Sequence, residues 1–219
     1  MSELACNGCD LLADLMTFGE QSRAIFTASI RDYHVYDSTE NEVQNPYPAG
    51  ELPNLLYAKS WIDTVQWHLE DVIRHPQIRP EEALAYKRRI DISNQERTNV
   101  VEAIDSFFLH YFGHIEPAAD ARVNSESPAW ALDRLSILAL KIYHMGTESS
   151  REAASHEHRR SCSQKLEVLY VQQGDLVGSI NELLEDIQAG RKYMKVYRQM
   201  KMYNDPGLNP VLYNAMKQK

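Results

Sequence analysis

The chain has 219 residues, of which 43% are hydrophobic and 25% are charged, with 9 glycines and 9 prolines. This composition excludes collagen-like, low-complexity and disordered proteins, and the length suits a single domain over residues 1–219. The net charge of -8 would repel a phosphate backbone, so we expect no nucleic-acid partner. The longest apolar stretch near the middle of the chain, Ile137–Leu140, is too short to cross a bilayer, so we expect no membrane partner.

The N-terminal region shows no secretory signal and no complete cysteine site. No basic segment followed by an apolar run occurs there, which predicts a cytoplasmic protein. Cys6 and Cys9 are two of three cysteines, and no second Cys or His pair lies nearby to complete a zinc site. We therefore expect reduced, idle thiols in a flexible N-terminus over residues 1–14.

Apolar residues recur at helical spacing along most of the chain, and no segment shows the alternation typical of a strand. Proline-rich or polar loops at 37–53 and 114–128 separate the helices, and residues 204–219 form a C-terminal extension rich in apolar and aromatic side chains. The pattern predicts an all-α fold, a helical bundle of about five main helices with a docked C-terminal segment. The expected helices cover residues 11–35, 54–74, 80–112, 129–148 and Cys162–Ile187.

The last of these helices contains two glycines within its apolar seam. Gly174 and Gly178 each cost about 1 kcal/mol of helix propensity relative to alanine. Such a cost suggests a bend or a close contact with another helix at these positions.

Two polar residues lie where the third helix should face the core. Asn94 and Arg97 share a face with Val101 and Ile104, and a buried charge requires a partner. The neighbouring helices offer carboxylates for this purpose, with Asp133 as the first candidate and Asp63, Glu70 and Asp71 as the others. The face indicates either a structural ion pair between helices or a polar pocket for an anionic or hydroxyl-rich ligand, closed by the C-terminal segment.

Further candidates follow on the fourth helix and near the C-terminus. Arg134, Lys141 and His144 form a stripe that is either a solvated face or a clamp for phosphate with a general acid. We expect the cation at Lys141 to lower the pKa of His144 and keep its ring neutral. The catalytic candidates are thus His144 and His68, and the ligand-binding candidates are Asp63, Glu70, Asn94, Arg97, Asp133, Arg134, Lys141 and Lys195.

The histidines give no local metal motif. His158 and Cys162 lie four residues apart with His156 nearby, but the adjacent cations of Arg159 and Arg160 disfavour a divalent ion. The Glu-x-x-His signature of di-iron bundles does not occur either. We therefore expect no metal and no cofactor.

Several stretches of the chain carry a family resemblance that extends over about residues 15–213. They resemble the bacterial domain-of-unknown-function family 4254 through Lys59-x-Trp61-Ile62-Asp63, Lys87-Arg88-Arg89-Ile90-Asp91, Asn124-x-Glu126-Ser127-Pro128, Asp133-Arg134-Leu135-Ser136-Ile137-Leu138 and Tyr203-Asn204-Asp205-Pro206. That family has no established activity, so the resemblance implies no reaction.

The Asp133–Leu138 stretch and the Tyr203–Asp205 ending are also similar to small helical proteins encoded beside bacterial glycosyltransferases. This similarity implies a binding or accessory protein of bacterial surface-glycan assembly, which holds an anionic ligand such as a sugar nucleotide or docks on a glycosyltransferase. The alternatives are a metal-independent transferase or hydrolase that uses His144 or His68 as acid/base, and a purely structural oligomeric bundle. We expect a homodimer, because two-fold dimers are the commonest oligomers.

Overall fold

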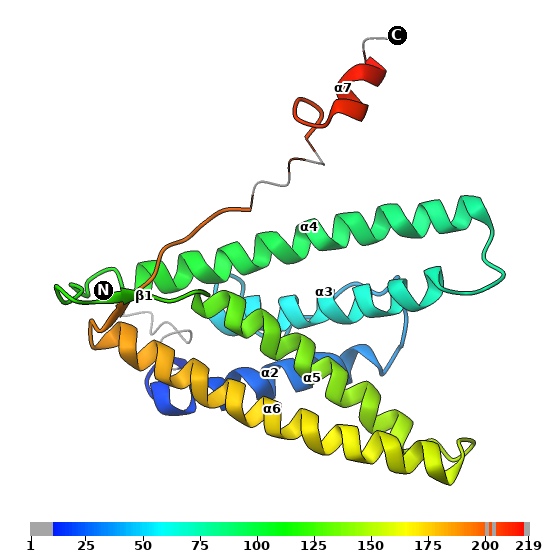
Figure 1. Ribbon diagram of the computed structural model, residues 1–219, viewed down its shortest axis with the longest axis horizontal. Helices are drawn as coiled ribbons and strands as arrows, with labels where there is room; N and C mark the ends of the chain where they lie inside the picture. Colours follow the sequence, from blue (N-terminus) through cyan, green and yellow to red (C-terminus); the bar gives the residue numbers. More distant parts are fainter. Residues whose placement is uncertain (1–10, 200–201, 203–204, 217–219) are drawn as a thin grey trace.

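The computed structural model describes residues 11–199, 202 and 205–216, and Cys6 and Cys9 therefore lie outside the described residues. The chain forms a bundle of long helices with a C-terminal segment, which confirms the expected all-α fold (Figure 1). Its elements are the 3-10 turn η1 (Leu15–Thr17), α2 (Phe18–Tyr33), α3 (Leu52–Ile73), α4 (Pro80–Tyr111), α5 (Pro128–Ser150), α6 (His156–Gln188) and the short α7 (Pro210–Met216).

The helix starts follow from local sequence. Pro80 and Pro128 each begin a helix, where the missing N–H of proline costs no hydrogen bond. The Ser127 side chain accepts a hydrogen bond from the Trp130 N–H at the start of α5, and Ser155 accepts one from His158 at the start of α6. The predicted starts of α3, α4 and α5 agree with the observed ones within two residues, whereas α2 begins at Phe18 instead of residue 11 and α6 begins at His156 instead of Cys162.

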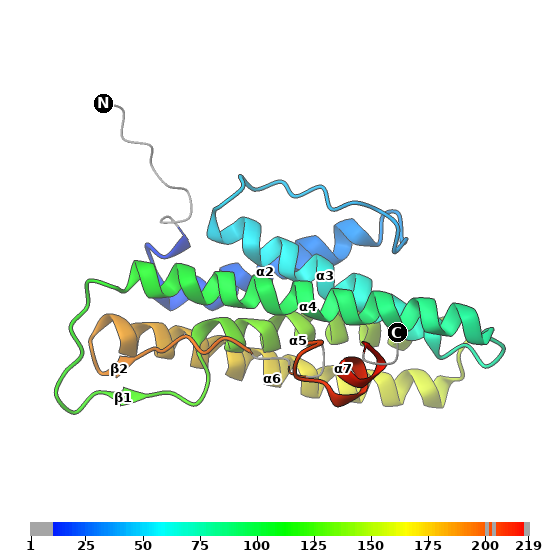
Figure 2. The ribbon, with the colours of Figure 1, turned by 90° about the horizontal axis from the view of Figure 1, so that it is seen from above.

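The helices pack as two hairpins with α2 between them. α3 pairs with α4 and α5 pairs with α6, while α2 contacts α3, α5 and α6. Figure 2 shows α5 and α6 on one side of α4, and α2 and α3 on the other. The shared core is apolar and includes the fully buried side chains of Phe18, Phe26, Leu52, Leu56, Phe108, Leu132 and Leu135.

Among the described residues the only strands are two of two residues each. β1 (Arg122–Val123) pairs in parallel with β2 (Lys192–Tyr193) and ties the loop after α4 to the chain that follows α6. Two residues are too few to show an alternating pattern, so sequence periodicity could not predict the pair. Further along the chain, the backbone N–H of Gln199 donates to the Glu102 carboxylate and so contacts α4. In α7, by contrast, the side chain of Val211 is 75% exposed to solvent.

The glycines of α6 mark no close helix contact. A side-chain carbon placed at Gly174 or Gly178 would meet nothing within 4 Å. The close approach occurs instead at Gly19 of α2, whose N–H donates to the buried Asn181 side chain on α6 at 2.7 Å. Among the described residues we also find no helix that combines the length and the apolar character needed to cross a bilayer.

Candidate functional site

A buried network of charges joins α3, α4 and α5. The Lys59 ammonium group contacts the Asp63 carboxylate one turn away and lies 2.8 Å from Oδ1 of Asp133. Arg97 donates from Nε and Nη2 to the two oxygens of Asp133, at 2.9 and 2.5 Å. Asp63 also accepts from the Ser136 hydroxyl at 2.6 Å. The predicted pairing of Arg97 with Asp133 is therefore confirmed, and Lys59 adds a second cation that sequence reasoning missed.

Burial and pairing act in opposite directions on the carboxylates of this network. Burial alone would raise the pKa of Asp133, but Lys59 and Arg97 hold the pKa below its usual value. Burial raises the pKa of Asp63 in spite of its contacts with Lys59 and Ser136. The network thus balances two cations against two carboxylates, which is the pattern of a structural ion cluster. Arg97 is the exception, because 25% of its side chain is exposed.

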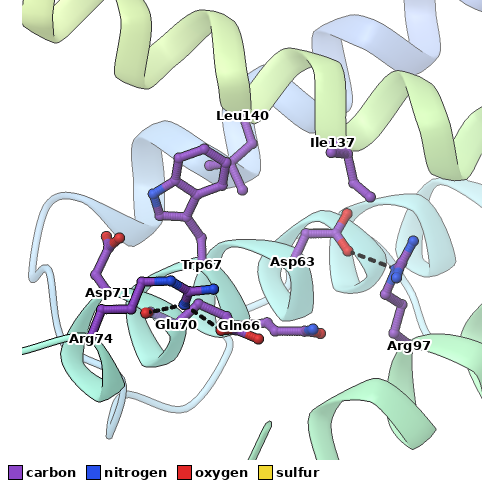
Figure 3. A pocket seen from close by; sticks show the side chains of 9 residues that line it. All are labelled: Asp63, Gln66, Trp67, Glu70, Asp71, Arg74, Arg97, Ile137 and Leu140. Carbon is purple, nitrogen blue, oxygen red and sulfur yellow. Dashed lines mark hydrogen bonds and ion pairs between the residues drawn. The ribbon is translucent and has the colours of Figure 1, made fainter.

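The exposed part of Arg97 lines a pocket between α3, α4 and α5 (Figure 3). Its volume is about 300 Å³. Trp67 and Leu140 give it an apolar wall, while the side chains of Asp63 and Arg97 lie together at its opposite end. The residues that line it are Asp63, Gln66, Trp67, Glu70, Asp71, Arg74, Arg97, Ile137 and Leu140.

The charges of this pocket are largely paired within the protein. Arg97 binds Asp133, and Arg74 donates to the Glu70 carboxylate at 2.5 Å. Carboxylates outnumber guanidinium groups in the lining. A ligand with many hydroxyl groups therefore suits the lining better than a compact anion, because a hydroxyl can both donate to a carboxylate and accept from a guanidinium group.

The structure separates the residues that sequence reasoning grouped together. Asp63, Glu70 and Arg97 line the pocket, Asp133 lies behind Arg97, and Asn94 accepts a hydrogen bond from the lining residue Gln66 at 3.0 Å. Among the described residues the lining comes from α3, its C-cap Arg74, α4 and α5, so the described part of the C-terminal segment does not close the pocket as we expected. The chain directly after α6 instead pairs with the loop that carries β1, through Lys192–Tyr193.

The basic candidates lie elsewhere. Arg134 and Lys141 line a separate groove between α5 and α6, where Arg134 donates to Glu126 at 3.0 Å. Lys195 lies over the ring of Tyr193, with its ammonium group 5.6 Å from the ring centroid. The three basic residues thus belong to two places on the surface, and neither place is the α3–α4–α5 pocket.

Both catalytic candidates belong to a histidine cluster whose third member, His34, was missed. His34 caps the C-terminal end of α2, His68 lies on α3, and His144 lies on α5. One ring nitrogen from each lies within 4.8 Å of the others. Aromatic rings hold two of the imidazoles, since Trp67 stacks on His144 at 4.6 Å and Tyr33 stacks on His68 at 5.2 Å between centroids.

His144 and His68 favour the neutral form. Burial, followed by the neighbouring His68 and His34, lowers the pKa of His144 to about 4. Burial and His34 likewise lower the pKa of His68. The predicted direction for His144 is thus confirmed, but its predicted cause is wrong, because Lys141 does not contribute to the shift.

A sequence signal for this cluster does exist. Each of its histidines directly follows an aromatic residue, in Tyr33-His34, Trp67-His68 and Tyr143-His144, whereas the other five histidines do not. The signal is spread over more than a hundred residues, so spacing rules for local metal or catalytic motifs do not find it.

Comparison with known proteins adds a family but no activity. No curated protein and no solved structure matches the chain. A family model described as a protein of unknown function (DUF4254) matches residues 53–196, which include every residue that lines the pocket. Because this match covers well over half of the chain, the protein belongs to the DUF4254 family.

Proposed function

We propose that this protein binds a small hydroxyl-rich ligand, such as the sugar part of a sugar nucleotide, in the α3–α4–α5 pocket. The observation that supports the proposal is the partly exposed guanidinium group of Arg97, fixed by Asp133 at one end of the pocket opposite the apolar wall of Trp67. A fixed donor opposite an aromatic wall can orient a polar ring, and pockets with few polar groups in an apolar lining are typical of small-molecule sites.

The size of the pocket favours one ring over a whole nucleotide. At about 300 Å³ it lies at the lower end of the range of small-molecule pockets, roughly 300–1,000 Å³. The sugar would therefore occupy the pocket and any phosphate would lie at its rim. Arg74 stands at that rim with 68% of its side chain exposed, where it can exchange Glu70 for a phosphate oxygen.

Calorimetric titration with a panel of sugar nucleotides and free monosaccharides tests this proposal. We expect Arg74→Ala to weaken binding of sugar nucleotides and Asp71→Asn to weaken binding of the sugar itself. Both residues line the pocket and are exposed, so neither change should unfold the protein.

The matched control is Arg79→Ala. Arg79 is 73% exposed and pairs with Glu82, as Arg74 pairs with Glu70, but it lies outside the pocket. Equal binding by the wild type, Arg74→Ala and Arg79→Ala would contradict a ligand site at this rim, as would a complete lack of binding across the panel.

The cellular part of the proposal is an accessory role in bacterial surface-glycan assembly, with a glycosyltransferase as the partner. It is supported by the similarity of the Asp133–Leu138 stretch to small proteins encoded beside such enzymes. The test is co-purification of the protein with a glycosyltransferase from its host. If the protein is recovered without a glycosyltransferase, the proposed partnership is contradicted.

A second candidate function is a transferase or hydrolase with a histidine acid/base and no metal. The observation that favours it is the contact of Trp67 with both the pocket and His144, which brings a neutral imidazole near the ligand. Conversion of a bound sugar nucleotide in the presence of a chelator, and loss of that conversion in His144→Phe, would favour the enzyme over the binding protein.

A further inference from the structure

We propose that His34, His68 and His144 form a binding site for a divalent transition-metal ion of the zinc type. This inference goes beyond the binding of a small ligand and does not depend on it. Three neutral imidazoles are a common ligand set for zinc, and other first-row ions of this class also accept them.

The distances suit a single ion. Nε2 of His34 and Nε2 of His68 lie 3.1 Å apart. Bonds of about 2.0–2.1 Å in tetrahedral geometry would place two ligand nitrogens roughly 3.3–3.4 Å apart. A ring nitrogen of His144 lies within 4.8 Å of both, so small side-chain shifts bring all three to bonding distance.

The hydrogen bonds of His34 direct its free nitrogen into the cluster. Its Nδ1 lies 2.7 Å from the Ile30 carbonyl oxygen, which can only accept, so Nδ1 carries the proton. In the neutral ring Nε2 of His34 then carries the free lone pair, and this nitrogen faces His68. A ligating histidine usually makes such an outer hydrogen bond, which fixes the ring and its tautomer.

The other two histidines also fit the role of ligands. Nδ1 of His68 lies 3.9 Å from the Asp71 carboxylate, so a small shift would give it the outer partner that zinc-bound histidines have. Nε2 of His144 is buried and has no hydrogen-bond partner among the described residues. A hydrogen bond between His68 and His34 alone would leave that nitrogen unsatisfied, whereas a metal ion bound through it would satisfy it.

A carboxylate stands beside the cluster where a fourth ligand would bind. Oδ1 of Asp37 lies 3.7 Å from Nε2 of His68. Asp37 has a φ of 49°, a left-handed conformation that few residues other than glycine adopt. The exposed carboxylate lies next to the imidazoles, where it can bind the ion directly or through a water molecule.

Zinc titration of the untagged protein tests the site. The protein is first stripped with a chelator and then titrated with Zn²⁺ in competition with a chromophoric chelator. We expect one ion per chain and a rise in melting temperature on addition of the ion, because a ligand that binds the folded state stabilises it. In His144→Phe, which keeps a ring against Trp67, we expect the affinity to fall by more than the roughly 100-fold that loss of an outer partner can cost.

The control is His158→Phe, because His158 lies 3.0 Å from a Glu148 oxygen and 3.4 Å from the Cys162 sulfur and could bind zinc with them. We expect this change to leave the affinity of the main site unaltered. The melting temperature of each metal-free variant shows that it folds, and His34→Gln replaces His144→Phe if the latter does not.

The proposal is overturned if the wild type binds Zn²⁺ no more tightly than His144→Phe, or if His158→Phe alone abolishes binding. The titration contains no sugar, so its failure is separate from failure of the proposed ligand function.

Discussion

Trp67 stacks face to face on His144, with the ring planes 5° apart and the centroids 4.6 Å apart, and it also lines the α3–α4–α5 pocket. The pocket and the histidine cluster therefore share one aromatic wall. Binding at the cluster should therefore shift the side chains that line the pocket, because Trp67 belongs to both and stacked rings in a packed core move together.

This contact predicts a fluorescence signal. Zn²⁺ bound at His144 places a charge next to the Trp67 ring, so we expect the ion to change the tryptophan fluorescence of the protein. Trp67→Phe should abolish the change. Trp130 lines a different pocket, so Trp130→Phe should retain the change. A change that survives in Trp67→Phe would contradict binding of the ion beside this ring.

The buried ion network predicts a large cost for loss of Arg97. Arg97→Ala leaves Asp63 and Asp133 with Lys59 as their remaining cation, and loss of one partner from a buried pair costs about 3 kcal/mol or more. We expect the melting temperature to fall by roughly 6–12 °C, at about 2–4 °C per kcal/mol for a chain of this size.

Arg134→Ala is the matched control for this change. Arg134 also pairs with a carboxylate, Glu126, but 63% of its side chain is exposed, so its loss should cost less than about 1 kcal/mol. A fall of less than about 2 °C for Arg97→Ala would mean that the network does not stabilise the fold.

Asp105 predicts a pH dependence of opposite sign to that of an ordinary salt bridge. Burial raises its pKa in spite of hydrogen bonds from Ser127 and Ala129. The fold thus prefers the protonated acid, so the contribution of Asp105 to the free energy of unfolding is fully present below about pH 3.9 and is lost as pH rises through the folded-state pKa.

Asp105→Asn removes this titration. The stability of the variant relative to the wild type should therefore increase as pH rises above about 4, measured by urea unfolding at a series of pH values. Asp120→Asn, in an exposed loop, is the control. A relative stability that is independent of pH, or that decreases with pH, would contradict the buried-acid interpretation.

Substitution by alanine should have opposite effects on stability at Gly19 and at Gly174. A Cβ at Gly19 would lie 2.8 Å from the Val177 carbonyl oxygen and 3.0 Å from the Asn181 side chain, so Gly19→Ala should destabilise the protein by about 1–3 kcal/mol. Gly174 has open space around it on α6, so Gly174→Ala should stabilise the protein by up to about 1 kcal/mol. Thermal unfolding of both variants checks this, and equal effects would contradict the close packing of α2 on α6.

The homodimer stays a prediction. The apolar seam of α6 is buried within the chain at Cys162, Ile180 and Ile187, so it does not require a second copy. The outer side of α6 instead exposes Val168 and Val171, at 56% and 65%. We expect light scattering to give twice 25.2 kDa and the Val168→Lys/Val171→Lys variant to give 25.2 kDa. A wild-type mass of 25.2 kDa at micromolar concentration would contradict the dimer.

Much of the fold and part of the site could be predicted from the sequence, because both depend on helical periodicity. The spacing of Arg97 with Val101 and Ile104 placed its side chain toward the core and so toward Asp133. Lys59 was missed because a lysine beside an apolar stripe usually reaches solvent through its long stem, whereas here its ammonium group is buried. The histidine cluster was missed because its members come from three helices, and only packing brings them together.

Native mass spectrometry of the untagged protein from its own host tests the central claim, a ligand in the α3–α4–α5 pocket, most directly. We expect the wild type to carry a sugar nucleotide or a related hydroxyl-rich molecule that is released on denaturation, and Arg79→Ala to carry the same molecule. Arg74→Ala, purified in parallel, should carry much less of it. A wild-type mass equal to that of the bare chain, or a bound molecule retained equally by Arg74→Ala, would contradict the claim.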